Sequence, residues 1–336
     1  MNVWELQAKP GLDSLTLIKR PEPQPLAGQV LLKMRAASLN YRDLMIAKGT
    51  YGSKQTLPLV PFSDGVGEVV AIGEGVTRVA VGDRVAGIFM QDWIAGSFRA
   101  EYAASALGGA IDGVLAEYVT LHEDGVVHVP EHLSDEEAAT LPCAAVTAWH
   151  ALITAGHLTA GDTVLILGTG GVSLFALQFA KLVGAQVIAT SSSDEKIERL
   201  LQLGASDAIN YKTTPDWEQA VWELTHKAGV DHVVEVGGAG TFNKSLKSVR
   251  MGGRVSLIGV LTGSSSEVST GTILQKSIAV QGIYVGSREM FTAMNRAIAL
   301  HKMKPMVDRV FPFEQAREAL AYMESGAHFG KIVIRF

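Results

Sequence analysis

The sequence predicts an α/β protein of two domains, a doubly wound parallel sheet over residues 145–285 and a β-rich domain over residues 1–144 and 286–336. Strand and helix patterns alternate from about residue 145 onward. The strands there are continuous apolar runs, as expected when helices cover both faces of a parallel sheet. Before residue 145, short β-branched segments are separated by glycines. The length of 336 residues suits two domains better than one core.

The elements of the first domain are predicted from β-branched runs and turn residues. Strands are expected at 30–36 and 67–73, and a turn that enters a strand at 81–85. The block after Gly286 no longer follows the parallel-sheet rhythm, and we expect it to return to the first domain. Its predicted elements are a helix at 289–301, a strand at 307–311, a helix at 313–325 and a strand at 331–336.

The elements of the central domain follow one another as strand and helix. The predicted strands are 163–167, 186–190, 231–236 and 254–258. The predicted helices are 171–183, 194–203, 216–228 and 242–249, with Gly204 ending the second of them.

Composition and charge argue against several classes of protein. The formal net charge is −5 and no run of Lys or Arg marks a nucleic-acid surface. No apolar stretch approaches the roughly 20 residues that span a bilayer, and the N-terminus does not resemble a signal peptide. The single cysteine, Cys143, excludes an intrachain disulfide and a Cys-rich structural zinc site. We expect a cytoplasmic protein without nucleic-acid or membrane partners.

A glycine-rich turn lies between a predicted strand and a predicted helix. The strand Val164–Leu167 runs directly into Gly168-Thr169-Gly170-Gly171-Val172-Ser173. In this context the motif predicts a Rossmann domain that binds a dinucleotide. Gly168 permits the tight turn, Gly170 allows the backbone to approach a pyrophosphate, and the helix N-terminus supplies free N–H groups.

The end of the next strand favours NADP(H) over NAD. Domains that prefer NAD carry an acidic residue there, whereas this strand ends in Thr190-Ser191-Ser192-Ser193. Ser192, Ser193 and Lys196, together with the helix N-terminus, are candidates to hold a 2′-phosphate. Ser192 and Glu195 also have the spacing of a helix capping box, and both roles are compatible.

Several motifs in a fixed order make the chain resemble the medium-chain dehydrogenase/reductase superfamily, in its quinone oxidoreductase and zinc-independent alcohol dehydrogenase-like branch. The motifs are 37–43 (ASLNYRD), 61–70 (PFSDGVGEVV), 81–85 (VGDRV), 141–149 (LPCAAVTAW), the glycine turn, 204–205 (GA), 209–211 (INY) and 330–333 (GKIV). The resemblance implies a GroES-like, β-rich catalytic domain with a Rossmann domain inserted in it.

The resemblance also implies positions for the cofactor and the partner subunit. Tyr211 should lie near the adenosine 2′-phosphate, and Gly259 belongs to the expected cofactor-binding set. Asn40, Thr147 and Arg288 should lie near the nicotinamide. In the family the strand near 278–283 pairs with its copy, which implies a homodimer.

The resemblance, compared residue by residue, argues against a catalytic zinc. The metal ligands of zinc-dependent relatives would fall at Asn40, Ser63 and Cys143, with the nearby Glu at Asp64. Asn and Ser bind zinc poorly. The four cysteines of a structural zinc site would fall in residues 88–113, and this segment contains no cysteine. Cys143 is interpreted as a packed thiol, with a metal or redox role left open.

Without a metal, conjugated acceptors are the more favourable substrates, because charge from the added hydride spreads onto an oxygen. Tyr41 and Arg42 are the candidate catalytic side chains, together with Asn40. Tyr41 either donates the proton or packs on the nicotinamide, and Arg42 either bonds the oxyanion or pairs with Asp43 or Asp64. The segment 88–113 is either a flexible substrate wall or a packed loop.

Three functions remain open at this point. The leading hypothesis is an NADPH-dependent reductase of quinones or α,β-unsaturated carbonyls. The second is an alcohol dehydrogenase that acts on an alcohol–aldehyde pair, with an atypical metal site or none. The third, of another class, is a protein that binds NADPH as a structural or sensing module.

Overall fold

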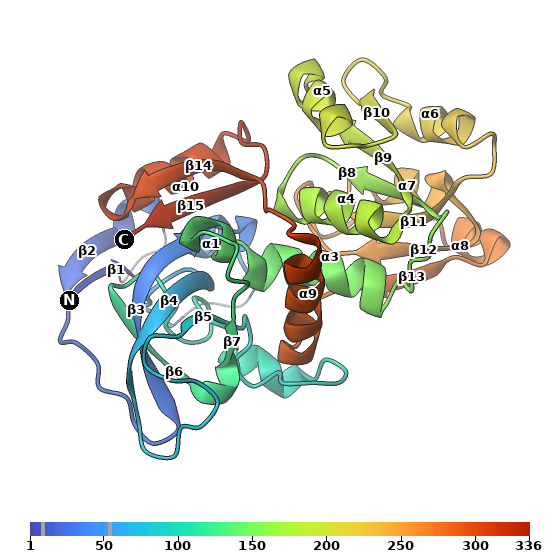
Figure 1. Cartoon of the computed structure of the whole chain (residues 1–336). Coiled ribbons are helices and arrows are strands. Elements are labelled where there is room, and N and C mark those ends of the chain that lie inside the picture. Colours follow the sequence, from blue (N-terminus) through green and yellow to red (C-terminus); the bar gives the residue numbers. More distant parts are fainter. Residues whose placement is uncertain (8–10, 53–55) are drawn as a thin grey trace. The chain divides into compact units, whose positions relative to one another are not determined.

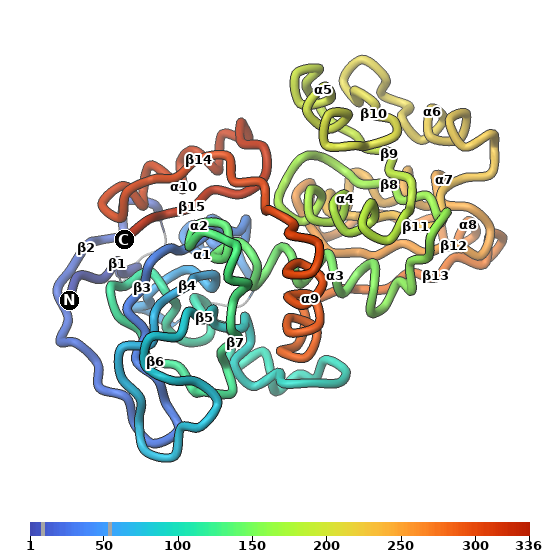
Figure 2. Tube along the Cα trace, viewed as in Figure 1, coloured from blue at the N-terminus to red at the C-terminus, as the bar shows by residue number. Residues whose placement is uncertain are grey.

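The computed structural model describes residues 1–7, 11–52 and 56–336, and the chain divides into two compact units. Unit 1 comprises Met1–Val146 and Val285–Phe336, and unit 2 comprises Thr147–Tyr284. Figure 2 follows the chain through unit 1 in blue and green, through unit 2 in green to orange, and back into unit 1 in red. Unit 2 is therefore inserted into the sequence of unit 1.

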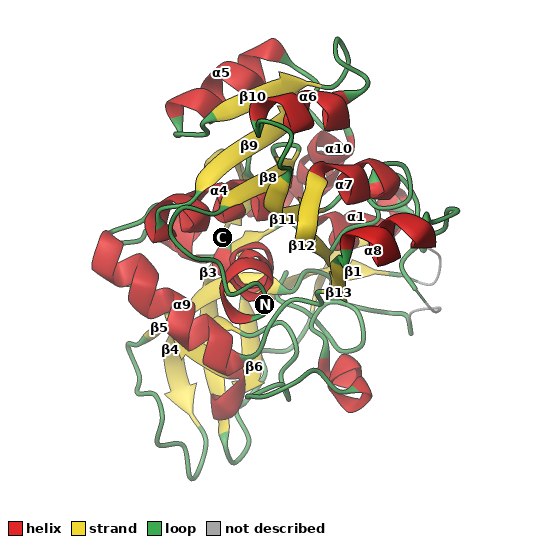
Figure 3. Ribbon diagram, turned by 90° about the vertical axis from the view of Figure 1, so that its right-hand side faces the viewer, coloured by secondary structure: helices red, strands yellow, loops and turns green. Residues whose placement is uncertain are grey.

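Unit 2 is built on a six-stranded sheet in the order β10-β9-β8-β11-β12-β13, with every neighbouring pair parallel. The six strands can be followed in this order in Figure 3. The strands are β8 (Thr163–Leu167), β9 (Gln186–Ser191), β10 (Asp207–Asn210), β11 (Val230–Glu235), β12 (Val249–Leu257) and β13 (Ala279–Gly282). The predicted α/β fold class, with a Rossmann-like parallel sheet, is confirmed.

Helices connect the strands of unit 2, and β8 is almost entirely buried. The helices are α4 (Gly171–Val183), α5 (Asp194–Gln202), α6 (Trp217–Leu224), α7 (Phe242–Ser248) and α8 (Thr270–Lys276). The short α3 (Val146–Trp149) stands at the unit boundary. Apolar side chains of β8, β9, β11 and β12 pack with those of α6 and α7 into one core.

Two elements of unit 2 differ from their predicted bounds by four residues or more. Helix α6 stops at Leu224, four residues before the predicted end at Ala228, because the next two residues after Thr225 have positive φ. The Thr225 hydroxyl also donates to the Val221 carbonyl. Strand β12 begins at Val249 rather than Arg254, with a register shift against β11. Strand β10 was not predicted.

Unit 1 contains a seven-stranded sheet and a separate pair, β1 (Asn2–Leu6) with β2 (Leu15–Lys19). The sheet order is β14-β15-β3-β4-β5-β7, and β6 also pairs with β3. Its strands are β3 (Gln29–Ser38), β4 (Asp64–Ile72), β5 (Arg84–Gly87), β6 (Tyr118–His122), β7 (Val126–His128), β14 (Val307–Pro312) and β15 (Lys331–Arg335). This is the GroES-like sheet domain expected from the sequence.

The last part of the chain joins unit 1, as Figure 1 shows in red. Strand β15 inserts between β14 and β3, antiparallel to β3. The helices of the unit are α1 (Tyr41–Ala47), α2 (Asp135–Ala138), α9 (Arg288–His301) and α10 (Ala316–Glu324). The N-terminal strands, β3, β4 and α10 share one apolar core. In the part of the chain that the structure describes, no helix is long and apolar enough to cross a membrane.

The segment 88–113 is buried at 88–90 and 105–108, whereas most residues of 95–104 are exposed. Trp93 is 1% exposed, and its ring stacks on Tyr102 at 6.1 Å and meets Phe98 edge-on at 5.3 Å. The carbonyls of Trp93 and Ile94 accept hydrogen bonds from the first backbone N–H groups of α9. The loop therefore stabilises the start of that helix, and Phe98 remains 43% exposed.

Candidate active site

The glycine turn of unit 2 has the geometry that a pyrophosphate needs. Gly168 has φ 71°, a left-handed conformation that favours glycine, and its N–H donates to the Thr190 carbonyl at 2.9 Å. Helix α4 begins at Gly171 as predicted, and Ser173 Oγ donates to the Leu167 carbonyl at 2.7 Å. The turn is therefore fixed between β8 and α4, with Thr169, Gly170 and Val172 at the uncapped N-terminus of a 13-residue helix.

Serines and no carboxylate stand at the end of β9. Ser191 is buried, whereas Ser192 and Ser193 are half-buried. The predicted capping box of Ser192 and Glu195 is wrong by one residue, because α5 begins at Asp194 and Ser193 Oγ accepts the Lys196 backbone N–H. Ser192 is thus not needed as a helix cap.

The neighbouring strand β10 places Tyr211 beside this serine segment. The Tyr211 backbone N–H donates to the Ser191 carbonyl at 3.0 Å, and its side chain is 41% exposed. Asn210 Nδ2 donates to Asp194 Oδ1 at 2.7 Å. The structure therefore brings Tyr211 to the serines, as the resemblance implied.

A buried carboxylate organises the loop after β11, and sequence reasoning missed it. Glu235 is fully buried and accepts hydrogen bonds from the backbone N–H groups of Gly237 and Gly238 at 2.7 and 2.9 Å. It also accepts the hydroxyl of Thr241 at 2.6 Å and that of Ser245. The Glu235 carbonyl in turn accepts the N–H of Gly259, at the end of β12. Two strand ends are thereby held together.

In unit 1, a chain of hydrogen bonds links the side chains of Lys331, Asn40, Ser63 and Asp64. Lys331 Nζ donates to Asn40 Oδ1 at 2.6 Å, and Asn40 Nδ2 donates to Ser63 Oγ at 3.4 Å. Ser63 Oγ donates to Asp64 Oδ1 at 2.7 Å, and the Cys143 backbone N–H donates to Asp64 Oδ2 at 2.9 Å. All four side chains belong to residues that are no more than 8% exposed.

Burial has the largest effect on the pKa values of the acidic groups around this chain of hydrogen bonds. It raises the pKa of Asp64, against the opposing effects of Lys331 and of the hydrogen bonds from Ser63 and Cys143. It also raises the pKa of Asp43 to about 7 and that of the Cys143 thiol to about 12. Cys143 is therefore a protonated thiol near neutral pH.

Helix α1 positions the two predicted catalytic side chains differently. Its N-cap is Asn40, and the Asn40 N–H donates to Asp43 Oδ2 at 2.7 Å in a capping box. Tyr41 follows the cap and is 43% exposed. Arg42 is 8% exposed, donates from Nη1 to the Leu107 carbonyl at 2.8 Å, and lies over the Phe89 ring at 4.3 Å.

Arg288 and Thr147, expected near the nicotinamide, belong to different units. Arg288 opens α9 in unit 1, where its Nη1 donates to Asp124 Oδ1 at 2.6 Å and to the Asp124 carbonyl at 2.9 Å. The hydrogen bond from Arg288 to the Asp124 carboxylate lowers the pKa of that group. Thr147 lies in unit 2 and is 3% exposed.

Two family models match the chain, one in each unit. The alcohol dehydrogenase GroES-like domain matches residues 26–131, and the zinc-binding dehydrogenase domain matches residues 171–299. A zinc-type alcohol dehydrogenase-like protein of Schizosaccharomyces pombe is 45% identical over 97% of this chain and 96% of its own. The chain belongs to the medium-chain dehydrogenase/reductase family. It is an oxidoreductase of that family.

Members of the medium-chain dehydrogenase/reductase family with different substrates and cofactors are similar to the chain. An acryloyl-coenzyme A reductase of Metallosphaera sedula is 31% identical over 93% of this chain and 94% of its own. An NAD-dependent alcohol dehydrogenase has a TM-score of 0.91, with 34% identity and full coverage of both chains. A mycobacterial protein solved in complex with NADPH has a TM-score of 0.84, with 27% identity and full coverage of both chains.

The residues that the resemblance places at the metal position of zinc-dependent relatives are poorly suited to zinc. Asn40 and Ser63 offer an amide and a hydroxyl group, and the Lys331 ammonium group bonds the Asn40 amide oxygen. No group of three His, Cys, Asp or Glu side chains among the described residues could hold a metal ion. We therefore derive no catalytic step through a metal.

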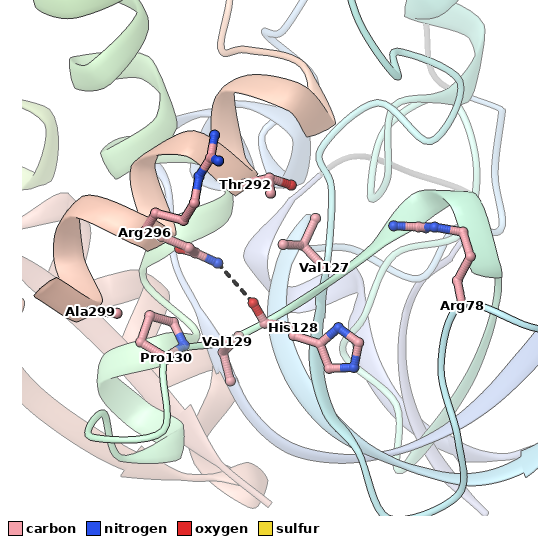
Figure 4. A pocket seen from close by; sticks show the side chains of 9 residues that line it. Arg78, Val127, His128, Val129, Pro130, Thr292, Arg296 and Ala299 are labelled. Carbon is pink, nitrogen blue, oxygen red and sulfur yellow. Dashed lines mark hydrogen bonds between the residues drawn. The ribbon is translucent and has the colours of Figure 1, made fainter.

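A separate groove of unit 1 lies between β7 and α9 and is shown in Figure 4. Arg78, His128 and Arg296 line it, and Asn295 Nδ2 donates to the His128 carbonyl at 2.9 Å. None of the residues predicted from the sequence to bind cofactor or substrate lines this groove.

Proposed function

We propose that this oxidoreductase transfers a hydride from NADPH to quinones or α,β-unsaturated carbonyls without a catalytic zinc. The observation that carries the proposal is the hydrogen-bond chain from Lys331 through Asn40 and Ser63 to Asp64. It occupies the positions at which zinc-dependent relatives have metal ligands. A site with an ammonium group there is suited to an acceptor that needs no Lewis acid.

The serine segment at the end of β9 supports NADP(H) as the cofactor. The hydroxyls of Ser192 and Ser193 are half-buried, and Lys196 follows in the first turn of α5. These groups and the helix N-terminus suit the dianionic 2′-phosphate, with Tyr211 beside them. The similar protein in complex with NADPH agrees with this choice, whereas the similar NAD-dependent alcohol dehydrogenase favours the other cofactor.

The chemistry assigned to the residues follows from their types. A bound NADPH would supply the hydride. The backbone N–H groups of 168–172 would bind its pyrophosphate, with Gly259 after the end of β12. The resemblance assigns Asn40, Thr147 and Arg288 to the nicotinamide end. Tyr41, whose side chain is 43% exposed, would donate the proton to the reduced acceptor. Arg42 is committed to the Leu107 carbonyl and the Phe89 ring, so we assign it a structural role.

Turnover and metal content together test this proposal. Purified protein is assayed for NADPH oxidation with 1,4-naphthoquinone and 3-buten-2-one, and its zinc is measured by mass spectrometry. We expect turnover that survives chelation, with far less than about one zinc per chain. Stoichiometric zinc and activity confined to alcohol–aldehyde pairs would establish the alcohol dehydrogenase instead. Tight NADPH binding without oxidation by any acceptor would favour the structural or sensing module.

A homodimer is the proposed assembly. Strand β13 stands at the edge of the unit 2 sheet, so no strand of the described part of the chain pairs with its outer side. Its Val280 side chain is 38% exposed. Sedimentation equilibrium should give twice the mass of the 336-residue chain, and a monomer at micromolar concentration would refute the pairing.

A further inference from the structure

Lys331 is a buried lysine with two hydrogen-bond partners. It stands first in β15, and its residue is 4% exposed. Its Nζ donates to the Leu39 carbonyl and, at 2.6 Å, to Asn40 Oδ1. A buried cation is costly unless its hydrogen bonds and charge are compensated, so this arrangement requires a specific environment.

The backbone around Lys331 fixes its position relative to Asn40. Gly330 has φ 95°, and a Cβ there would lie 2.3 Å from the Met306 carbonyl oxygen, so only glycine fits. The Lys331 N–H donates to that same carbonyl at 2.9 Å. On the other side, the Leu39 N–H donates to the Ile332 carbonyl at 3.0 Å. The segment that carries Asn40 is thereby attached to the strand that carries Lys331.

The ammonium group determines which way the Asn40 amide points. With Oδ1 bound to Lys331, Nδ2 is directed to Ser63 and can contribute a hydrogen bond to Asp64. The contact from Nδ2 to Ser63 is long, at 3.4 Å, so it contributes little to orienting the amide. The bond to Lys331 is short and charge-assisted, and it therefore dominates.

Lys331 also supplies positive charge that acts on two buried acidic groups. Asp43 and Asp64 are both fully buried, and their charges are opposed by those of Arg42 and Lys331. Asp43 Oδ1 has no hydrogen-bond partner among the residues that the structure describes. Removal of the ammonium group would leave the Asn40 carbonyl oxygen unsatisfied and reduce the compensation of the two carboxylates.

We propose that Lys331 is a positioning residue for hydride transfer, which holds the Asn40 amide in one orientation. The proposal rests on the proposed function, because Asn40 is expected at the nicotinamide end of the cofactor. Lys331 acts through Asn40.

The test compares Lys331→Met, which keeps the apolar stem, with Lys331→Arg, which keeps the charge. Lys19→Met, at an exposed position of β2, is the matched control. For Lys331→Met we expect kcat for 1,4-naphthoquinone to fall about tenfold or more, with the NADPH Kd from tryptophan fluorescence changed less than about threefold. Lys331→Arg should recover part of kcat, and Lys19→Met should match the native protein.

Three outcomes would overturn the proposal. The first is a kcat within about twofold of native for a folded Lys331→Met protein. The second is an equal loss in the Met and Arg variants. If Lys331→Met does not fold, the double variant Lys331→Met/Asp64→Asn, which also removes one buried carboxylate, is assayed in its place. The third outcome is a native kcat for that double variant.

A structural readout separates this proposal from the proposed function. Crystal structures of native protein and of Lys331→Met should show the Asn40 amide rotated or displaced in the variant. Suppose that the native protein fails to oxidise NADPH with every acceptor tested, but the amide still moves in the variant. The proposed function then fails and the positioning of Asn40 stands. If the amide does not move, the positioning role fails, whatever the native activity.

Discussion

Asn210 Nδ2 donates to Asp194 Oδ1 at 2.7 Å, and this contact occupies the first carboxylate that follows β9. Asp194 belongs to the first turn of α5 rather than to the strand end. The strand end is left to Ser191, Ser192 and Ser193. An NAD-binding carboxylate would have to be introduced there, which makes cofactor choice testable by one substitution.

Ser192→Asp should reverse the cofactor preference. A carboxylate repels the 2′-phosphate of NADPH and accepts a hydrogen bond from the 2′-hydroxyl of NADH. We expect kcat/KM for NADPH to fall about tenfold or more, with NADH less affected or improved. Ser325→Asp, an exposed position after α10 in unit 1, controls for added charge. An unchanged ratio of the two cofactors would exclude Ser192 from the 2′-phosphate site.

Ser193 and Ser192 should differ in their effect on stability. Ser193 Oγ accepts the Lys196 N–H as the N-cap of α5, and loss of such a cap costs about 1 kcal/mol. Ser193→Ala should therefore lower the free energy of unfolding by about that amount in urea titrations. Ser192→Ala is the matched control and should cost less than half as much. Equal losses would contradict the assignment of the cap.

Tyr41→Phe tests the proton donor. If the Tyr41 hydroxyl delivers the proton, its removal should lower kcat by more than about tenfold with little change in NADPH affinity. Tyr118→Phe in β6 controls for the loss of a hydroxyl elsewhere in unit 1. Native turnover by Tyr41→Phe would leave Tyr41 as a residue that packs near the nicotinamide.

Cys143 should be unreactive in the folded protein. Cys143 is half-buried, and desolvation raises the pKa of its thiol to about 12, so little thiolate exists at pH 8. Alkylation by iodoacetamide, followed by mass spectrometry, should be about 100-fold slower in native protein than in denatured protein. One label per chain is expected after unfolding, because the sequence has one cysteine. Rapid labelling of the native protein would revive a redox or metal role.

Asp43 should make stability depend on pH. Its pKa is raised from 3.8 to about 7 in the folded state, so the folded state binds a proton more tightly than the unfolded state. The contribution of Asp43 is therefore fully present below about pH 4 and is lost as the pH rises through about 7. Between pH 5 and pH 8, native protein should lose more than about 1 kcal/mol relative to Asp43→Asn.

Urea titrations of both proteins at the two pH values give this difference directly. Asn at position 43 can still accept the Asn40 N–H, so the helix cap is kept. A parallel pH dependence of the two proteins would show that Asp43 keeps one protonation state throughout this range.

Local patterns made much of the central sheet predictable from the sequence. The helix at Gly171–Val183 and the strand at Thr163–Leu167 have the predicted bounds, because glycines mark the turn between them and apolar runs fill the strand. Strand β10 was missed because it has only four residues, two of them polar. The cap of α5 was misplaced because three consecutive serines give the same local signal.

The polar chain of the site depended on contacts that no local pattern encodes. The positions of Asn40, Ser63, Asp64 and Cys143 followed from the resemblance, but their connection to Lys331 did not. Lys331 and Asn40 are 291 residues apart in sequence. The one available signal was a lysine immediately before the apolar run Ile332–Ile334, since a charge at the head of a buried strand requires a partner.

The insertion of β15 between β14 and β3 has a consequence for biosynthesis. A ribosome makes β3 first and then all of unit 2, and only afterwards the strand that completes the earlier sheet. Until β15 emerges, β3 lacks one of its neighbours and the Asn40 amide lacks its cation. All of unit 2 is synthesised before β15, so the unit 1 sheet can be completed only after residues 331–335 have been made.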